Sequence, residues 1–173
     1  MYKLLIFILS AAIIVSFFLP WFNIEQAQAG AVKRVFTKEG LYFVELSGFK
    51  MPLFMNGRDS GLILDLIKTV NPNARQAAEK SYLLWLVPVI AAGIYLGIKK
   101  KPDSIIINFL VACLGLGISV FTLYKLSTVN LDKIIVRFEI QQGFWITVIS
   151  FFAIGVLGLL RINFLYNRKP KRD

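Results

Sequence analysis

The sequence predicts an α-helical membrane protein, built as a four-transmembrane-helix bundle with a small extracytoplasmic antiparallel β-sheet. Composition is the first reason. Of the 173 residues, 57% are hydrophobic and only 17% are charged, whereas an average soluble domain carries about 25% charged residues. The second reason is pattern, because four apolar runs are separated by loops in which strand-like segments occur. The single cysteine excludes a disulfide framework, and the high hydrophobicity excludes disorder.

Each of the four apolar runs is long enough to cross a bilayer as a helix, which takes about 20 residues. They cover residues 4–20, 82–98, 104–124 and 144–166, so residues 1–173 are expected to form a single membrane domain. A cleaved signal peptide is the alternative for the first run, with Ala27-Gln28-Ala29 before the cleavage point. We favour a retained helix, because the run is long for a signal core and ends well before that tripeptide.

Basic residues predict the orientation. With a cytoplasmic N-terminus, the cytoplasmic pieces are residues 1–3, 99–103 and 161–173, which hold nine of the 20 basic residues in 21 positions. The positive-inside rule therefore places both termini in the cytoplasm and the large loop outside. Nucleic acid is not an expected partner, because the basic residues are divided among three short pieces next to the membrane. Attraction to the anionic headgroups of the lipid bilayer explains the basic tail better.

The first outer loop, residues 21–81, is expected to fold with strands and a short helix. Residues 31–37 and 41–46 are rich in β-branched and aromatic side chains and flank a turn that ends in Gly40, which predicts a β-hairpin. Met51 to Met55 is mostly apolar, but Pro52 argues against a central strand there. Further on, apolar residues spaced by three and four from Leu62 to Val70 predict a helix.

The second outer loop, residues 125–142, contains one predicted strand. Residues 133–140 mostly alternate between apolar and charged side chains, which is typical of a half-buried strand. A two-stranded hairpin is only marginally stable alone. We therefore expect this strand to pair with the first-loop hairpin, which offers an apolar face as its partner. The candidate residues for that face are Val32, Val35, Phe43 and Val44.

The sequence offers little catalytic chemistry, so we expect no enzyme activity, no catalytic, cofactor-binding or metal-binding residues, and no cofactor. Histidine is absent, which removes the commonest general base and metal ligand. The only cysteine, Cys113, lies within the third run and is interpreted as a buried packing residue. Two alternatives stay open. The first alternative to a structural or accessory subunit is a small transporter or channel subunit. The second, which is less favoured, is a membrane enzyme.

Small and aromatic residues in the runs suggest how the helices pack. Small residues let helix backbones approach in lipid, either within the bundle or between copies. The helix-packing candidates are Gly93, Gly97, Gly115 and Ser119. Aromatic residues at the ends of the runs predict an interfacial belt. Its outer members are Trp21, Tyr82, Trp85, Tyr124, Phe144 and Trp145.

The overall pattern resembles the claudin-type four-span architecture. Trp21 follows the first run, and Gly40-Leu41-Tyr42 is similar to the family's Gly-Leu-Trp triplet. Arg75, just before the second run, also fits. The resemblance implies a bundle of four spans that carries a sheet made from both outer loops. The chain departs from the family in lacking the two first-loop cysteines that form a disulfide.

The chain looks closer to small bacterial four-span proteins of undefined function. The motifs that carry this likeness are Leu19-Pro20-Trp21, Ser47-Gly48-Phe49 and Gly143-Phe144-Trp145. The likeness implies a bacterial protein of the plasma (inner) membrane. We expect an integral membrane structural or accessory subunit that contacts another membrane protein, or itself as a homo-oligomer, laterally and at its outer face. An apolar run in the first loop supplies the candidate partner-binding residues: Phe49, Met51, Leu53, Phe54 and Met55.

Overall fold

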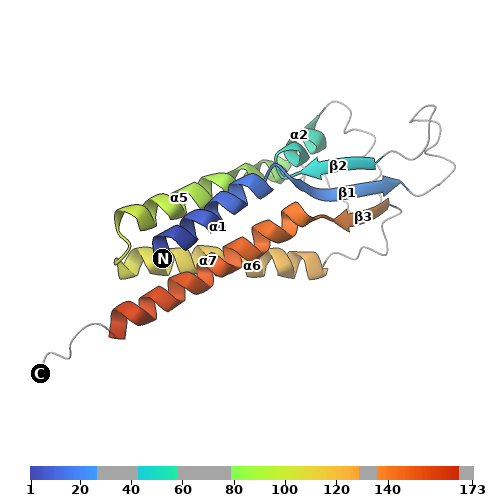
Figure 1. Ribbon diagram of the computed structural model, residues 1–173. Helices are drawn as coiled ribbons and strands as arrows, with labels where there is room; N and C mark the ends of the chain where they lie inside the picture. The colour runs from blue at the N-terminus through green and yellow to red at the C-terminus, as the bar shows by residue number, and fades with distance from the viewer. Residues whose placement is uncertain (27–42, 58–78, 129–135, 168–173) are drawn as a thin grey trace, which may run out of the picture.

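A computed structural model describes residues 1–26, 43–57, 79–128 and 136–167 of the chain (Figure 1). Four helices run lengthwise, and a small sheet stands at one end of them. We call this end the sheet end, and the opposite end, where residues 101–104 join two helices, the turn end. In chain order the elements are α1 (Tyr2–Ser16), β1 (Pro20–Gln26), β2 (Phe43–Ser47), α2 (Lys50–Asn56), the 3₁₀ helix η2 (Ser81–Trp85), α5 (Leu86–Lys100), α6 (Ile105–Thr128), β3 (Val136–Ile140) and α7 (Gln142–Asn167).

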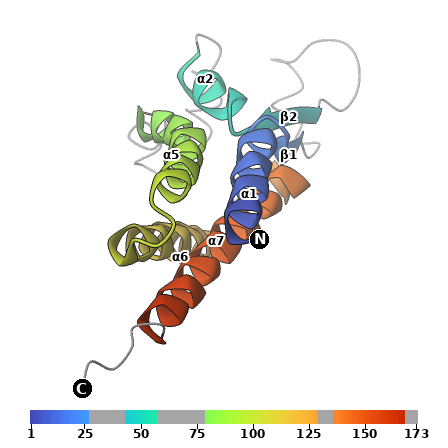
Figure 2. The ribbon, with the colours of Figure 1, turned by 60° about the vertical axis from the view of Figure 1, so that its left-hand side comes forward.

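The four long helices are arranged as an open ring. α1 packs against both α5 and α7, and α6 packs along α7. α5 and α6, although consecutive in the chain, make few contacts with each other. Figure 2 shows α5 and α6 lying apart on the side away from α1. The ring is therefore closed along three seams and open along the fourth.

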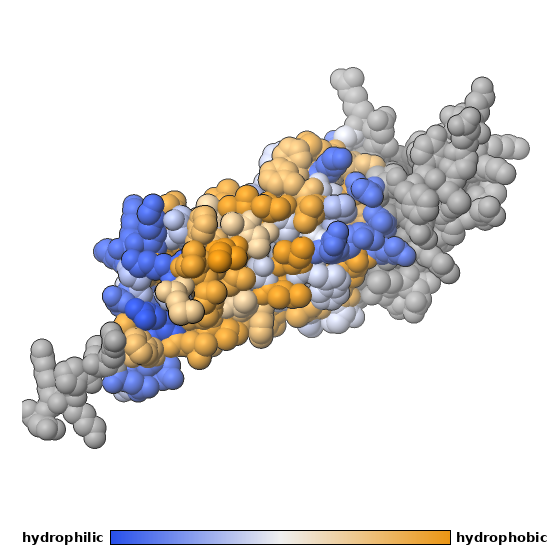
Figure 3. Space-filling model, in the orientation of Figure 1, coloured by the Kyte–Doolittle hydropathy of each residue, from blue (hydrophilic) through white to orange (hydrophobic). Residues whose placement is uncertain are grey.

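Three helical segments are long and apolar enough to cross a membrane: Ser81–Lys100, Ile105–Ser127 and Gln142–Asn167. α1 is apolar too, but its 15 residues measure only about 22 Å at 1.5 Å per residue. It begins before the predicted limit at residue 4, and it ends at Ser16 rather than near residue 20, because the chain turns and enters β1 at Pro20. Between polar ends, apolar residues cover most of the visible surface (Figure 3). These features identify a membrane-embedded protein.

The seam between α6 and α7 depends on glycine. A Cβ atom added to Gly115 would lie 2.6 Å from both the Gly155 nitrogen and the Phe151 carbonyl oxygen, so the two backbones touch directly. The Ser119 hydroxyl bridges the same seam, because its one proton is shared between the carbonyls of Gly115 at 2.8 Å and Val148 at 3.1 Å. This is the small-residue packing that lipid favours, because helix association there depends on close approach.

The other packing candidates lie elsewhere. Gly97 faces the α5–α6 turn, where a Cβ atom added to it would lie 3.5 Å from Ile107 Cγ2, whereas a Cβ atom added to Gly93 would have no described atom within 4 Å. Cys113 is exposed on α6. The prediction of a buried thiol was therefore wrong. An apolar helix in a membrane carries apolar residues on its lipid-facing side as well as its inner side, so polarity does not mark which side is buried.

The turn end is held by polar contacts among three helices. The Tyr2 hydroxyl donates to the Asn108 side-chain oxygen at 2.5 Å, and the Asn108 amide donates to the Pro102 carbonyl at 2.8 Å. Arg161 on α7 forms an ion pair with Asp103, and its guanidinium group lies 5.4 Å from the centre of the Tyr2 ring. The starts of α1 and α6 and the last part of α7 are thereby fixed to one another.

The sheet has three antiparallel strands in the order β2-β1-β3. A strand within residues 133–140 that joins the first outer loop was predicted, and β3 is that strand. Among the described residues β3 pairs with β1, which the sequence did not predict as its partner. The predicted partner was the hairpin at 31–37 and 41–46, of which only residues 43–46 are described. β1, which follows α1 in the chain, is the central strand. Its Ile24 pairs with Val44 of β2 on one side and with Phe138 of β3 on the other.

Several sequence predictions fall outside the described residues. These are the strand at 31–37 with Val32 and Val35, the triplet at 40–42, the helix from Leu62 to Val70, and Arg75. Phe43 and Val44 lie in β2, where they pair with Glu25 and Ile24 of β1. Residues 51–55 form most of α2, in agreement with the argument against a strand there.

We predict that Gly115→Ala destabilises the protein and that Gly117→Ala does not. A methyl group at Gly115 would meet the α7 backbone at 2.6 Å, and such overpacking costs about 1–3 kcal/mol. Gly117, on the same helix, has no described atom within 4 Å of an added Cβ. Thermal unfolding of the two variants in one detergent measures the difference. Equal melting temperatures would contradict the direct contact between α6 and α7.

Candidate functional site

Three motifs that are far apart in the sequence meet around the side chain of Trp21. They are Leu19-Pro20-Trp21 after α1, Ser47-Gly48-Phe49 between β2 and α2, and Gly143-Phe144-Trp145 at the start of α7. A Cβ on Gly48 would lie 2.9 Å from Trp21 Cε2, and one on Gly143 would lie 2.9 Å from Trp21 Cδ1. Both glycines therefore leave room for the indole, which explains why the motifs contain them.

The Trp21 indole is buried at the junction of the helices and the sheet. Only 4% of the residue is exposed, and its Nε1 donates a hydrogen bond of 2.7 Å to the Ser16 carbonyl. The ring makes edge-on contacts with Phe17 and Phe144, at centroid distances of 6.0 and 5.9 Å. Trp21 was expected in an exposed interfacial belt, and so was Phe144, which is only 7% exposed. That expectation was wrong for these two residues.

A β-bulge aims Trp21 inward. In the β1–β2 pairing, Pro20 lies opposite Ser47 and Phe22 lies opposite Leu46, so Trp21 is an extra residue without a partner in β2. Neighbouring residues of a regular strand point to opposite faces, and a bulge changes this. Trp21 and Phe22 consequently both contact Phe144 on α7, with centroid distances of 5.9 and 5.6 Å.

Hydroxyl groups link α1 and α7 beneath the indole. The Ser16 and Thr147 hydroxyl oxygens lie 2.7 Å apart, within hydrogen-bond distance. Thr147 also contacts the Gly143 carbonyl at 2.9 Å, and Ser16 contacts the Ile13 carbonyl at 2.9 Å. Each hydroxyl has a partner within the bundle, so these polar groups position helices and are not free to bind an incoming molecule.

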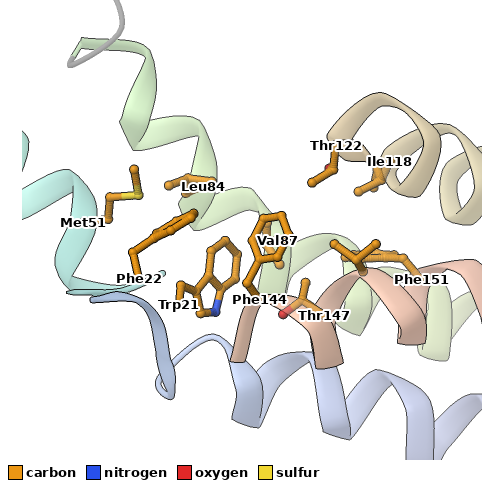
Figure 4. A pocket seen from close by; sticks show the side chains of 11 residues that line it. Trp21, Phe22, Met51, Leu84, Val87, Ile118, Thr122, Phe144, Thr147 and Phe151 are labelled. Carbon is orange, nitrogen blue, oxygen red and sulfur yellow. The ribbon is translucent and has the colours of Figure 1, made fainter. Parts of the chain in front are cut away.

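An apolar cavity of about 180 Å³ lies beside Trp21 (Figure 4). Six elements contribute to its walls, and the two sides of the open seam face each other across it. The lining residues are Trp21, Phe22, Met51, Leu84, Val87, Ile118, Thr122, Phe144, Thr147, Val148 and Phe151. Its volume exceeds that of an engineered apolar cavity of about 150 Å³ that stays dry and binds benzene. The cavity can therefore accept part of an apolar molecule.

The lining residues are mostly apolar. None of them has a carboxylate, thiol, imidazole or amine, and the only hydroxyl groups among them are those of Thr122 and Thr147. Among the described residues, no group of three or more His, Cys, Asp or Glu side chains is placed to hold a metal ion.

The five predicted partner-binding residues divide between the cavity and the surface. Met51 lines the cavity. Phe49 is 42% exposed and stacks on Trp85 at a centroid distance of 6.1 Å, and Leu53, one turn further along α2, is 47% exposed. The remaining two are partly buried: Phe54 and Met55. The prediction grouped these residues as one run, but a helix separates them onto different faces.

We predict that Trp21→Phe lowers the free energy of unfolding by about 1–3 kcal/mol, because it leaves the buried Ser16 carbonyl without its indole donor. Trp145→Phe is the matched control, since Trp145 is 40% exposed. Unfolding titrations of both variants in mixed detergent micelles compare them. A loss for Trp145→Phe as large as that for Trp21→Phe would show that the buried hydrogen bond is not the cause.

Comparison with known proteins adds no relative to this description. No protein-family model matches the chain, and neither does any curated protein or solved structure. A fold in any case does not fix a function, which has to be argued from the residues of the site. The claudin-type and bacterial four-span resemblances therefore stay predictions.

Proposed function

We propose that the chain is an integral membrane structural or accessory subunit that binds another membrane protein, or a second copy of itself, through an aromatic surface at its sheet end. The observation that carries the proposal is a continuous group of exposed aromatic and aliphatic side chains at the end of α1 and on α2 and η2. Its members, which we call the aromatic surface, are Phe18, Phe49, Leu53, Tyr82 and Trp85.

The aromatic surface has the composition of an interaction site. Phe49 contacts Phe18 at 5.7 Å and Trp85 at 6.1 Å, and Trp85 contacts Tyr82 at 5.4 Å, all measured between ring centroids. Each of these rings is more than a third exposed. Tyrosine, tryptophan and phenylalanine are enriched in protein interfaces, because they bury a large area and lose little conformational freedom.

The proposal includes four membrane spans, with α1 as the first. Two contacts between α1 and α7 support it. Tyr2 packs on Arg161 at the turn end, and Ser16 bonds to Thr147 near the sheet end. The first residue of this pairing on α1 meets the last one on α7, so the two helices are antiparallel. The spacing from Tyr2 to Ser16 equals the spacing from Thr147 to Arg161, so the helices stay side by side between the two contacts. Fourteen residues of helix measure about 21 Å, so α1 accompanies α7 through most of a hydrocarbon core of about 30 Å. This pairing is the support for counting α1 as a span.

The proposed orientation has the turn end in the cytoplasm of a bacterial cell and the sheet end outside the inner membrane. The N-terminus and the connection between α5 and α6 lie at the turn end (Figure 1). The basic residues there are Lys3 near the start of α1, residues 99–101 at the end of α5, and Arg161, which pairs with Asp103 of the connection. The positive-inside rule applies to short segments of this kind next to spans. It follows that the aromatic surface lies at the outer boundary of the membrane, where a neighbouring membrane protein can reach it from the side.

Cysteine labelling tests the orientation. We predict that, in a Cys113→Ser background, an impermeant thiol reagent added to intact cells labels Arg58→Cys and leaves Lys171→Cys unlabelled. The reason is the positive charge that flanks the spans in residues 99–103 and 161–173. Permeabilised cells provide the control, because both variants must react there. Labelling at 171 but not at 58 in intact cells would reverse the orientation.

Photo-crosslinking tests the partner contact. With a benzophenone amino acid at position 53, on the aromatic surface, we predict one protein adduct of fixed mass in the membrane. The same amino acid at position 106, on the exposed face of α6, serves as the control, since Ile106 is 72% exposed. Phe49→Ser should abolish the adduct from position 53 without lowering the protein level.

The mass of the adduct separates the outcomes. An adduct of two differently tagged copies of the chain identifies self-assembly, and an adduct with one other protein at constant stoichiometry identifies a hetero-partner. Crosslinks to lipid alone at position 53, or an adduct unaffected by Phe49→Ser, would overturn the proposed function.

A further inference from the structure

The cavity beside Trp21 lies at the open seam of the helix ring. α5 and α6 approach each other near the turn end, where Gly97 lies next to Ile107, and make few contacts beyond it. One wall of the cavity consists of Leu84 and Val87, and Ile118 and Thr122 form part of the facing wall on α6 (Figure 4). The cavity therefore occupies the space that the two diverging helices leave between them.

Hydrocarbon is the medium next to this seam. The outward faces of the two helices carry exposed apolar side chains, among them Val89 at 63%, Val120 at 60% and Phe121 at 61%. In a membrane such faces contact lipid acyl chains, because water is absent from the bilayer core. A water molecule in the cavity would gain few hydrogen bonds, whereas a methylene chain would gain dispersion contacts with the aromatic and aliphatic lining.

We propose that the cavity binds one acyl chain of a membrane phospholipid, inserted between α5 and α6 with its headgroup-proximal carbons against Trp21 and Phe144. A volume of about 180 Å³ suits a segment of a chain rather than a whole lipid. The Thr147 hydroxyl is already bonded to Ser16 and Gly143. Thr122 adds the one other hydroxyl to a lining that is otherwise mostly apolar, so the site favours hydrocarbon over a polar ligand.

Lysines near the sheet end of the seam suit the phosphate of the same lipid. Three exposed lysines, one on α2, one just before η2 and one on α6, lie close in the chain to residues that line the cavity, and Glu79 is next to Lys80. An ammonium group close to the membrane surface attracts anionic headgroups. The lysines are Lys50 beside Met51, Lys80 before Leu84 and Lys125 after Thr122.

This inference rests on the cavity and on the membrane-embedded helices, and it does not depend on the proposed partner contact. The two tests are separate, because the crosslinker at position 53 reports on the aromatic surface and the experiment below reports on the interior. The two readouts are different, so a failure of one proposal is distinguishable from a failure of the other.

Tryptophan quenching by brominated lipid tests the site in the full chain. The sequence has 3 tryptophans, and Trp85→Phe with Trp145→Phe leaves Trp21 as the sole emitter. The protein is reconstituted into phosphatidylcholine–phosphatidylglycerol vesicles, with or without bromine on the acyl-chain carbons nearest the headgroup. Bromine quenches indole only at short range. We expect Trp21, although 4% exposed, to lose as large a fraction of its emission as a protein that keeps only the exposed Trp145.

Two cavity-filling variants show where the chain lies. Val87→Phe and Ile118→Phe fill the cavity from facing walls, and each should largely abolish the quenching of Trp21. Val89→Phe is the control, because it enlarges an exposed residue of the same helix as Val87. It should leave the quenching unchanged.

Either of two quenching results would overturn the proposal: Trp21 emission that brominated chains do not lower, or quenching that persists in both filling variants. A red shift of the Trp21 emission in unbrominated vesicles marks a variant that has failed to fold. The unfilled Trp21-only protein then decides the question, together with native mass spectrometry of the unaltered chain. A phospholipid must stay bound in that spectrum after detergent exchange, and its absence also overturns the proposal.

Discussion

The end of α1 sets the constraint on which the sheet end depends. The last carbonyl groups of a helix have no partner within it, and at an apolar boundary such groups are costly to leave unbonded. The Leu19 N–H donates to the Ser16 carbonyl at 3.2 Å, and two further donors from beyond the end of α1 complete the set. The Trp21 indole donates to the Ser16 carbonyl at 2.7 Å, and the Phe49 backbone N–H donates to the Phe17 carbonyl at 3.2 Å. These two bonds bring β1 and the β2–α2 turn onto the bundle, and β3 follows through the bond of 2.8 Å from the Gln141 N–H to the Trp21 carbonyl.

Unequal side-chain size then explains the open ring. α6 lies against α7 at glycine, with no side chain between the backbones at Gly115 and Gly155. At the sheet end, the space between α7 and α5 instead receives aromatic rings from β1 and from α7 itself, chiefly those of Trp21 and Phe144. α6 packs closely on α7, whereas aromatic rings separate α5 from α7. α5 and α6 therefore diverge from the turn that connects them. The cavity follows from this geometry, because both its walls are held by contacts made elsewhere.

Hydropathy was sufficient to predict the three long helices, because a bilayer-length apolar run has few alternative structures. It was not sufficient for the junction. β1 directly follows an apolar run, so the short alternation of Phe22 and Ile24 with polar residues could not be told apart from the end of that run. The inward direction of Trp21 results from a bulge, which forms only when β1 pairs with β2. Two signals were present: Pro20, which suits the first residue of a strand, and the glycines of the other two motifs. The exposure of Cys113 could not be predicted, because lipid-facing and buried sides of a span have similar polarity.

The cavity and the aromatic surface share their supporting elements, which connects the two proposals physically. On α2, Met51 lines the cavity, whereas Leu53 and the preceding Phe49 are exposed. On η2, Leu84 lines the cavity, whereas Trp85 is exposed. α2 has only seven residues, and a helix of that length has little stability of its own. The position of the exposed Leu53 on α2 therefore depends on the contacts that Met51, on the inward side of the same helix, makes with the cavity. An acyl chain against Met51 and Leu84 would add contacts to both elements at once, so filling the cavity would order the surface that a partner has to recognise.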